Sequence, residues 1–75
     1  MKIIYDNKTD IAYIDLGGKS VPEDVNLTYT CDAQQINGLI NLEFSFDGRL
    51  LGLEILDATN KLPSDLLKRA EAKKG

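Results

Sequence analysis

The chain has 75 residues, a formal net charge of −3, no histidine and a single cysteine, Cys31. We expect one domain, residues 1–75, and a domain this small buries only about 60–65% of the surface that its unfolded chain exposes. An internal disulfide is excluded and a structural zinc site is disfavoured, so we expect no metal and no cofactor. Association with a partner is therefore the reinforcement that remains open to a chain with a thin stability margin.

The composition is that of an ordinary folded protein, with 43% hydrophobic and 28% charged residues. The acidic balance argues against nucleic-acid binding, which depends on Lys and Arg at the phosphates. The sequence has no apolar run near the roughly 20 residues of a membrane span, and its first residues turn polar too early for a signal peptide. A single cysteine suits a reducing compartment, so we expect a cytoplasmic protein that does not bind membranes.

Residues 2–16 have the pattern of a β-hairpin. Two segments rich in β-branched and aromatic residues are separated by turn-forming residues at positions 6–10. Pairing Tyr5 with Ala12, and Ile3 with Ile14, puts these four side chains on one face of the hairpin. The other face then holds Ile4, Ile11 and Tyr13.

A middle strand is predicted at about residues 25–32. A loop with Gly17, Gly18 and Pro22 precedes it, and apolar residues then occupy every second position from Val25 to Cys31. This period of two is typical of a half-buried strand. The dipeptide Asn37–Gly38 indicates a turn, so we expect an irregular break over residues 33–38.

A second hairpin is predicted at residues 38–56. Asp47–Gly48 favours a two-residue turn in which both central residues have positive φ. With Phe46 and Arg49 flanking this turn, three apolar pairs fall on one face, as a well-specified register requires. These pairs are Phe44 with Leu51, Leu42 with Leu53, and Ile40 with Ile55.

The last part of the chain predicts one C-terminal helix. Pro63 suits a first helical turn, and Asp65 lies near its positive end. Apolar residues recur at three- and four-residue spacings and form one stripe, made of Leu62, Leu66, Leu67 and Ala70. We therefore expect an α+β fold: an antiparallel sheet of four to five strands with one C-terminal helix packed on one face.

This helix is wide enough for only one side of the sheet, and we assign it to the face of Leu42, Phe44 and Leu53. The opposite face also carries apolar residues, and a contiguous apolar patch usually marks an interface. The candidate interface consists of Ile4, Ile11, Tyr13, Leu39, Leu50, Gly52, Glu54 and Leu56. Alternatively these positions are scattered, or the loop at residues 17–24 covers them.

Glu54 lies in the middle of this second face, opposite Asn41 in the predicted register. In a buried interface the Glu54 carboxylate needs a hydrogen-bond partner, which Asn41 or Tyr13 can supply. On an open face Glu54 is a solvated strand residue. Both interpretations remain open from the sequence.

The sequence contains no catalytic motif that we can assign. Without histidine, the Ser-His-Asp and Cys-His arrangements are absent. Carboxylates are plentiful, but their spacing does not match a calcium-binding loop. A basic cluster near the C-terminus is explained most simply by the dipole of the predicted helix. It consists of Lys68, Arg69, Lys73 and Lys74.

Two segments together resemble a known family. Residues 5–14 (YDNKTDIAYI) and residues 47–58 (DGRLLGLEILDA) are similar to the opening and closing motifs of domain-of-unknown-function family 2283, a family of small prokaryotic proteins. Residues 25–37 depart from its pattern. The positions that match the family motifs are Asp10, Tyr13, Gly52, Glu54 and Asp57.

The resemblance implies no assigned activity. Similar proteins are often encoded beside small toxin-like proteins, which implies a partner-binding role such as that of an antitoxin. Our leading hypothesis is a protein-interaction module, either a homo-oligomer or a subunit that binds a small toxin-like partner. The second is a small-ligand or metal-binding enzyme that uses Tyr13, Glu54 and Asp57. The third is DNA binding by the basic end of the helix.

Overall fold

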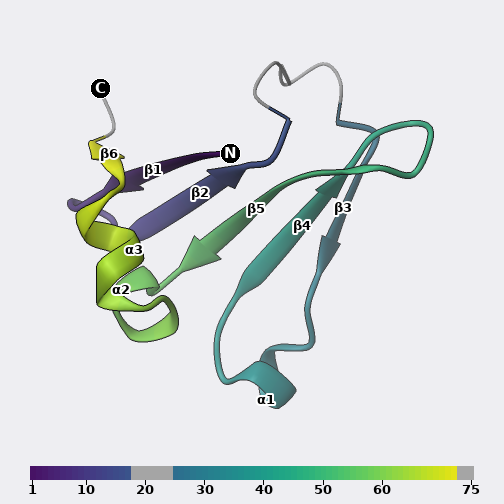
Figure 1. Ribbon diagram of the computed structural model, residues 1–75. Coiled ribbons are helices and arrows are strands. Elements are labelled where there is room, and N and C mark those ends of the chain that lie inside the picture. Colours follow the sequence, from purple (N-terminus) through teal and green to yellow (C-terminus); the bar gives the residue numbers. More distant parts are fainter. Residues whose placement is uncertain (18–24, 73–75) are drawn as a thin grey trace.

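The computed structural model describes residues 1–17 and 25–72 (Figure 1). Its described residues form an α+β fold with a mixed sheet of six strands, in the order β3-β4-β5-β2-β1-β6. In chain order the elements are β1 Lys2–Asp6, β2 Ile11–Asp15, β3 Leu27–Thr30, α1 Ala33–Ile36, β4 Ile40–Phe44, β5 Leu50–Leu56, α2 Ala58–Lys61, α3 Ser64–Lys68 and β6 Glu71–Ala72. Within the described part, no helix is long and apolar enough to cross a membrane.

The two predicted hairpins join through their inner strands. The predicted register of the first hairpin is confirmed, with Tyr5 opposite Ala12 and Ile3 opposite Ile14. β2 pairs antiparallel with β5, so that Ala12 faces Ile55. The predicted middle strand is present as β3, which pairs with β4 and forms one edge of the sheet.

The register of the second hairpin is correct over most of its length. Two predicted pairs are confirmed: Ile40 with Ile55 and Leu42 with Leu53. The third is wrong, because Phe44 pairs with Leu50 rather than Leu51. The register shifts between Glu43 and Phe44, as it does at a β-bulge, where one strand carries an extra residue. Leu50 therefore stands opposite Phe44, on the face that carries Leu42, and not on the second face predicted for it.

The turn at Asp47–Gly48 also differs from the two-residue prediction. Gly48 has a φ of 83°, but Asp47 is not among the residues with positive φ. The Gly48 amide donates to the Ser45 carbonyl at 3.1 Å, and the Ser45 amide donates to the Arg49 carbonyl at 2.9 Å. The loop is thus a three-residue connection in which only the glycine needs the left-handed conformation.

The prediction of one C-terminal helix is wrong, since the segment forms two short helices and a strand. Leu62 precedes Pro63 and is extended (φ −112°, ψ 148°), which ends α2 at Lys61. Pro63 then stands at the N-cap of α3. After α3 the chain returns to the sheet as β6, which pairs parallel with β1 and makes the sheet mixed.

A further short helix, α1, occupies part of the predicted break at residues 33–38. The Asp32 carboxylate caps it by accepting a hydrogen bond of 2.9 Å from the Gln34 amide. Asn37 ends it with a left-handed φ of 51°.

The core lies where α2 and α3 meet the sheet, and it is small. Among the described residues, the buried hydrophobic side chains are Ala12, Ile55 and Ala58. Partly buried residues surround them: Tyr5, Ile14, Ile40, Leu53, Leu62 and Leu67. Figure 1 shows α2 and α3 at the β1–β2 end of the sheet, away from β3. The expectation that helix covers this whole face, including Leu42 and Phe44, is therefore wrong: about half of the face has no helix over it.

Candidate interaction surface

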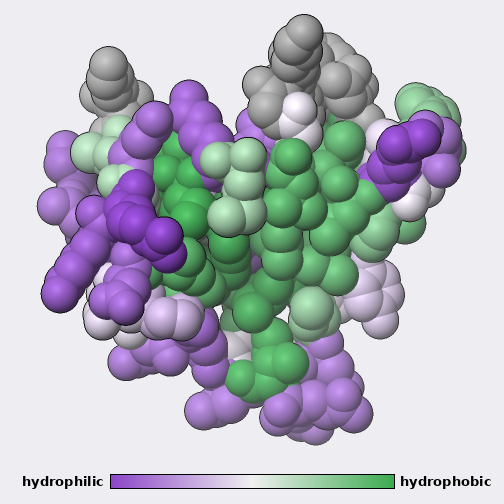
Figure 2. All heavy atoms as spheres, viewed as in Figure 1, coloured by the Kyte–Doolittle hydropathy of each residue, from purple (hydrophilic) through white to green (hydrophobic). Residues whose placement is uncertain are grey.

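The face that carries α2 and α3, here called the near face, is open over β3, β4 and β5. We define the open half-face as Leu27, Tyr29, Leu42, Phe44, Leu50 and Leu53. Figure 2 shows a continuous hydrophobic surface over these strands, beside the helices. The exposed fractions of Leu27, Tyr29 and Leu50 are 55%, 59% and 38%. A patch of this kind is unusual on a protein that functions alone.

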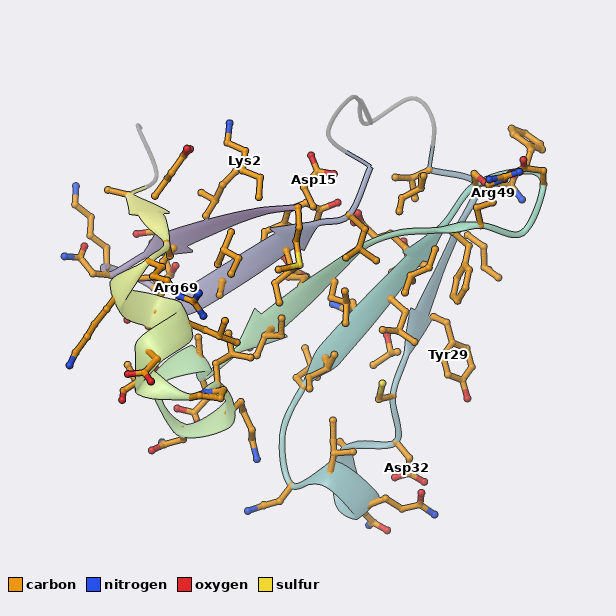
Figure 3. The ribbon with its side chains drawn as sticks, in the orientation of Figure 1. Lys2, Asp15, Tyr29, Asp32, Arg49 and Arg69 are labelled. Atoms are coloured by element: carbon orange, nitrogen blue, oxygen red, sulfur yellow. The ribbon has the colours of Figure 1, made fainter. Side chains whose placement is uncertain are left out.

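Strand pairing explains why this surface has no charged side chain. Leu27 pairs with Phe44 and Tyr29 with Leu42, so apolar residues of neighbouring strands lie in rows. Residues of alternate parity, including Glu43 and Glu54, point to the opposite side, here called the far face. In Figure 3, Tyr29 lies between the two labelled charges nearest to it, Asp32 and Arg49, which mark the two ends of this region.

On the far face, Tyr13 of β2 lies over Gly52 of β5. A Cβ atom at position 52 would lie 2.7 Å from Tyr13 Cζ and 2.9 Å from the carbonyl oxygen of Ile14, so only glycine fits here. The Tyr13 hydroxyl donates a hydrogen bond of 2.6 Å to Glu43 Oε1. Burial, reinforced by the Glu43 carboxylate, raises the pKa of Tyr13 well above its ordinary value, which keeps the hydroxyl a donor.

A second set of hydrogen bonds crosses β3, β4 and β5 on the far face. The Asn41 amide donates to Glu54 Oε1 at 2.8 Å, as predicted, and Thr30 Oγ1 donates to Asn41 Oδ1 at 2.7 Å. Tyr13, the other predicted partner of Glu54, bonds to Glu43 instead. In the described part of the chain, every buried side-chain nitrogen or oxygen has a partner. The far face thus satisfies its polar groups within the chain.

Asp10 links the first turn to α2. Its carboxylate accepts hydrogen bonds from the Tyr5 hydroxyl (2.7 Å), the Thr59 amide (3.2 Å) and the Thr59 hydroxyl (2.8 Å). The Ala58 amide donates to the Asp10 carbonyl at 3.0 Å. The Tyr5 hydroxyl, followed by the Thr59 hydroxyl, lowers the pKa of Asp10. This family-motif residue therefore holds the helix on the sheet.

Asp57, another motif position, has a similar local role. It adopts a left-handed φ of 56° directly before α2, and its two carboxylate oxygens accept hydrogen bonds of 3.0 and 3.2 Å from the side-chain Nδ2 of Asn60. The chain reverses direction at this position, and an aspartate suits it because Asp and Asn tolerate the left-handed region.

A shallow hollow of about 330 Å³ lies on the far face and brings together four of the predicted interface residues. Its lining consists of Ile4, Asp6, Thr9, Ile11, Tyr13 and Glu54. Leu56 pairs with Ile11 next to it, and the Leu56 amide bonds to the Leu39 carbonyl. Gly52 lies under the Tyr13 ring, and Leu50 belongs to the other face. The described residues include no cluster of His, Cys, Asp or Glu that could hold a metal ion.

Three residues of these surfaces are not predicted as site residues by the sequence pattern: Leu27, Tyr29 and Glu43. Tyr29 pairs with Leu42 and therefore lies on the face that the predicted helix was expected to cover. The alternation of β3 contained the missing signal, since it adds a further apolar row that a helix of about ten residues is too narrow to reach. Glu43 gave no comparable signal, because its bond to Tyr13 depends on β2 pairing with β5 and β5 with β4.

Residues 2–58 match the family model described as "Protein of unknown function (DUF2283)". No curated protein and no solved structure matches the chain. The matched segment includes both motifs, the hydrogen bond from the Ala58 amide to the Asp10 carbonyl and the Tyr13–Gly52 pair. Because the match covers most of the 75 residues, the chain belongs to the family of unknown function DUF2283.

Proposed function

We propose that this protein is a protein-interaction module whose open half-face binds a protein partner. The observation that carries the proposal is the contrast between the core, which among the described residues has three buried hydrophobic side chains, two of them alanines, and an uncharged apolar half-face beside it. Burial of apolar surface is the main favourable term in folding and in most protein association. A partner on the open half-face supplies burial that the chain lacks by itself.

The near face fits this role better than the far face that the sequence suggested. Far-face polar groups such as Tyr13, Asn41 and Glu54 already have partners inside the chain. A protein bound there would have to cover these groups without breaking their bonds, and an unpaired buried group costs about 1–3 kcal/mol. Among the residues that define the open half-face, the Tyr29 hydroxyl is the one polar side-chain group that a partner would have to pair or leave in contact with water.

The kind of partner suggested by the family resemblance is a small toxin-like protein, and a second copy of the chain is the other candidate. The single cysteine, Cys31, supports a reducing compartment such as the cytoplasm as the site of this interaction.

Co-expression with the products of adjacent genes tests the proposal. We expect the purified chain to have a mass in solution above 8.3 kDa, either alone or with such a product. Tyr29→Lys should abolish the larger species, because it puts a charge into the open half-face. Thr28→Lys, on the same strand but the far face, is the matched control and should retain it. A chain that stays at 8.3 kDa in every combination contradicts the proposal.

The hollow on the far face favours a second candidate function, binding of a small ligand beside Tyr13 and Glu54. Pockets that combine apolar walls with a few polar groups are the usual sites for such ligands. Divalent metals and a metabolite panel should then raise the melting temperature of the wild-type chain but not of Glu54→Gln. Equal melting curves with and without every compound would exclude this candidate.

A further inference from the structure

We infer that the partner on the open half-face is a second copy of this chain, bound by the same half-face around a two-fold axis that runs along the strands. This inference rests on the proposed function and specifies its partner. Three independent features of the molecule support it: the charge of the surface, its shape and the area that the chain leaves exposed.

The first feature is charge. In a two-fold interface the same patch occurs on both sides, so like charges near the axis would face each other. The open half-face has no charged residue, although the chain as a whole has a net charge of −3. The nearby charges Asp32 and Arg49 lie at its two ends, where an interface has its polar rim (Figure 3). A strongly basic partner would find no complementary acidic groups within this surface.

The second feature is shape. A helix with its side chains is about 10–12 Å across, and packed sheets are about 10 Å apart. The layer formed by α2 and α3 therefore has the thickness that a second sheet would have on the open half-face. Two open half-faces can meet as a sandwich, with the helices of each copy beside the β3 edge of the other.

The position of the helices also fixes the direction of the axis. Because α2 and α3 stand at the β1–β2 end of the near face, a two-fold axis across the strands would drive them into the sheet of the second copy (Figure 1). An axis along the strands puts the two pairs of helices at opposite ends of the sandwich. Leu42, on the central strand of the open half-face, then faces Leu42 of the second copy, and Tyr29 faces Leu53 of the second copy.

The third feature is exposed area. In the single chain Leu27 is 55% exposed, Tyr29 59% and Leu50 38%, and all three side chains belong to the open half-face. Contact around the two-fold axis would cover these side chains on both copies at once, whereas a monomer rarely exposes large contiguous apolar patches.

Sedimentation of the purified chain without other proteins tests the inference. The wild-type chain should have twice the mass of 8.3 kDa, and Thr28→Lys should behave in the same way. Tyr29→Lys should raise the dissociation constant at least about tenfold, because a charge buried without a partner is costly. Tyr29 is mostly exposed in the single chain. The circular dichroism spectrum of the Tyr29→Lys variant should therefore remain that of a folded chain.

A charge pair at Leu42 tests the axis itself. Leu42→Lys and Leu42→Glu should each be largely monomeric, because like charges meet across the axis. An equimolar mixture should form dimers, each with one lysine and one glutamate variant. Failure of the mixture to associate, with both variants folded, would overturn the proposed arrangement.

The two proposals fail in different ways. A wild-type chain that is monomeric alone but forms a complex with an adjacent gene product, lost in Tyr29→Lys, overturns self-association and supports the interaction module. A chain that is monomeric in both settings overturns both proposals.

Discussion

The two faces of the sheet differ in how their side chains are paired and covered. On the far face, Tyr13 covers Gly52 and bonds to Glu43, and Asn41 bonds to Glu54, so the side chains have partners within the chain. On the near face, α2 and α3 cover the β1–β2 end and leave the apolar rows of β3, β4 and β5 open (Figure 2).

This difference teaches that apolar content alone does not identify an interface. Both faces carry apolar residues, and because the predicted helix was assigned to the near face, the sequence pointed to the far face. What separates the faces is whether the groups on each have partners inside the chain. By that criterion the near face is the one for which we propose a partner.

The largest expected effect comes from the covered end of the near face. Ile55→Ala should cost about 2–5 kcal/mol, because it removes the largest fully buried side chain of the described core. Leu27→Ala, in the open half-face, should cost less than about 0.5 kcal/mol. Both should be measured by urea unfolding in the Tyr29→Lys background, where a partner does not cover the open half. Equal losses would contradict the contrast between the two ends.

On the far face, Gly52→Ala should cost about 1–3 kcal/mol through overpacking. The Tyr13 ring can move, but the backbone oxygen of Ile14, 2.9 Å from the new Cβ, cannot. Thermal unfolding should show a fall of roughly 4–8 °C for each kcal/mol lost. Gly48→Ala is the control, because no atom lies within 4 Å of its Cβ and only the left-handed backbone penalises it. A Gly52→Ala variant with the melting temperature of the wild-type chain would contradict the close approach of Tyr13 to Gly52.

Tyr13→Phe should cost about 1 kcal/mol by removing the hydrogen bond to Glu43. Because the pKa of Tyr13 is raised in the folded chain, the bond contributes fully below pH 10, and its contribution is lost as the pH rises above that value. The stability difference between wild type and Tyr13→Phe should therefore be constant up to about pH 10 and shrink above it. Urea unfolding at several alkaline pH values measures this difference, and a difference that persists unchanged would argue against the bond.

The smallest expected effect concerns Asp10, whose pKa lies below its ordinary value of 3.8. A carboxyl group with a depressed pKa contributes stability above its unfolded pKa, and that contribution is lost as the pH falls through the folded pKa. Wild type should thus melt above Asp10→Asn at pH 7, and the two melting temperatures should converge below about pH 4. Asparagine tolerates the left-handed φ of 56°, so backbone strain does not enter the comparison. A difference in melting temperature between the two proteins that is the same at every pH would contradict a role for the Asp10 charge.

Both hairpins could be predicted from the sequence, because alternation and turn residues specify strand pairing locally. Ile3 opposite Ile14 and Leu42 opposite Leu53 follow from that pattern. The bulge before Phe44 could not be predicted, since nothing in the alternation of β5 indicates an extra residue. The split of the C-terminal helix had a visible cause in Pro63, which disfavours helix at Leu62.

The candidate site was less predictable because it depends on how elements pack. The bond between Asn41 and Glu54 was predicted, since the two residues are direct cross-strand neighbours. The openness of the half-face around Tyr29 follows from the position of α2 and α3 at one end of the sheet. Distant contacts set that position, above all the bonds between Asp10 and Thr59.

The concentration dependence of thermal unfolding tests the central claim most directly, namely that a second copy covers the open half-face and stabilises the fold. A folded state that associates has a melting temperature that rises with protein concentration. We predict this rise for the wild-type chain and a lower melting temperature, independent of concentration, for Tyr29→Lys. Identical and concentration-independent melting temperatures for the two proteins would contradict the claim.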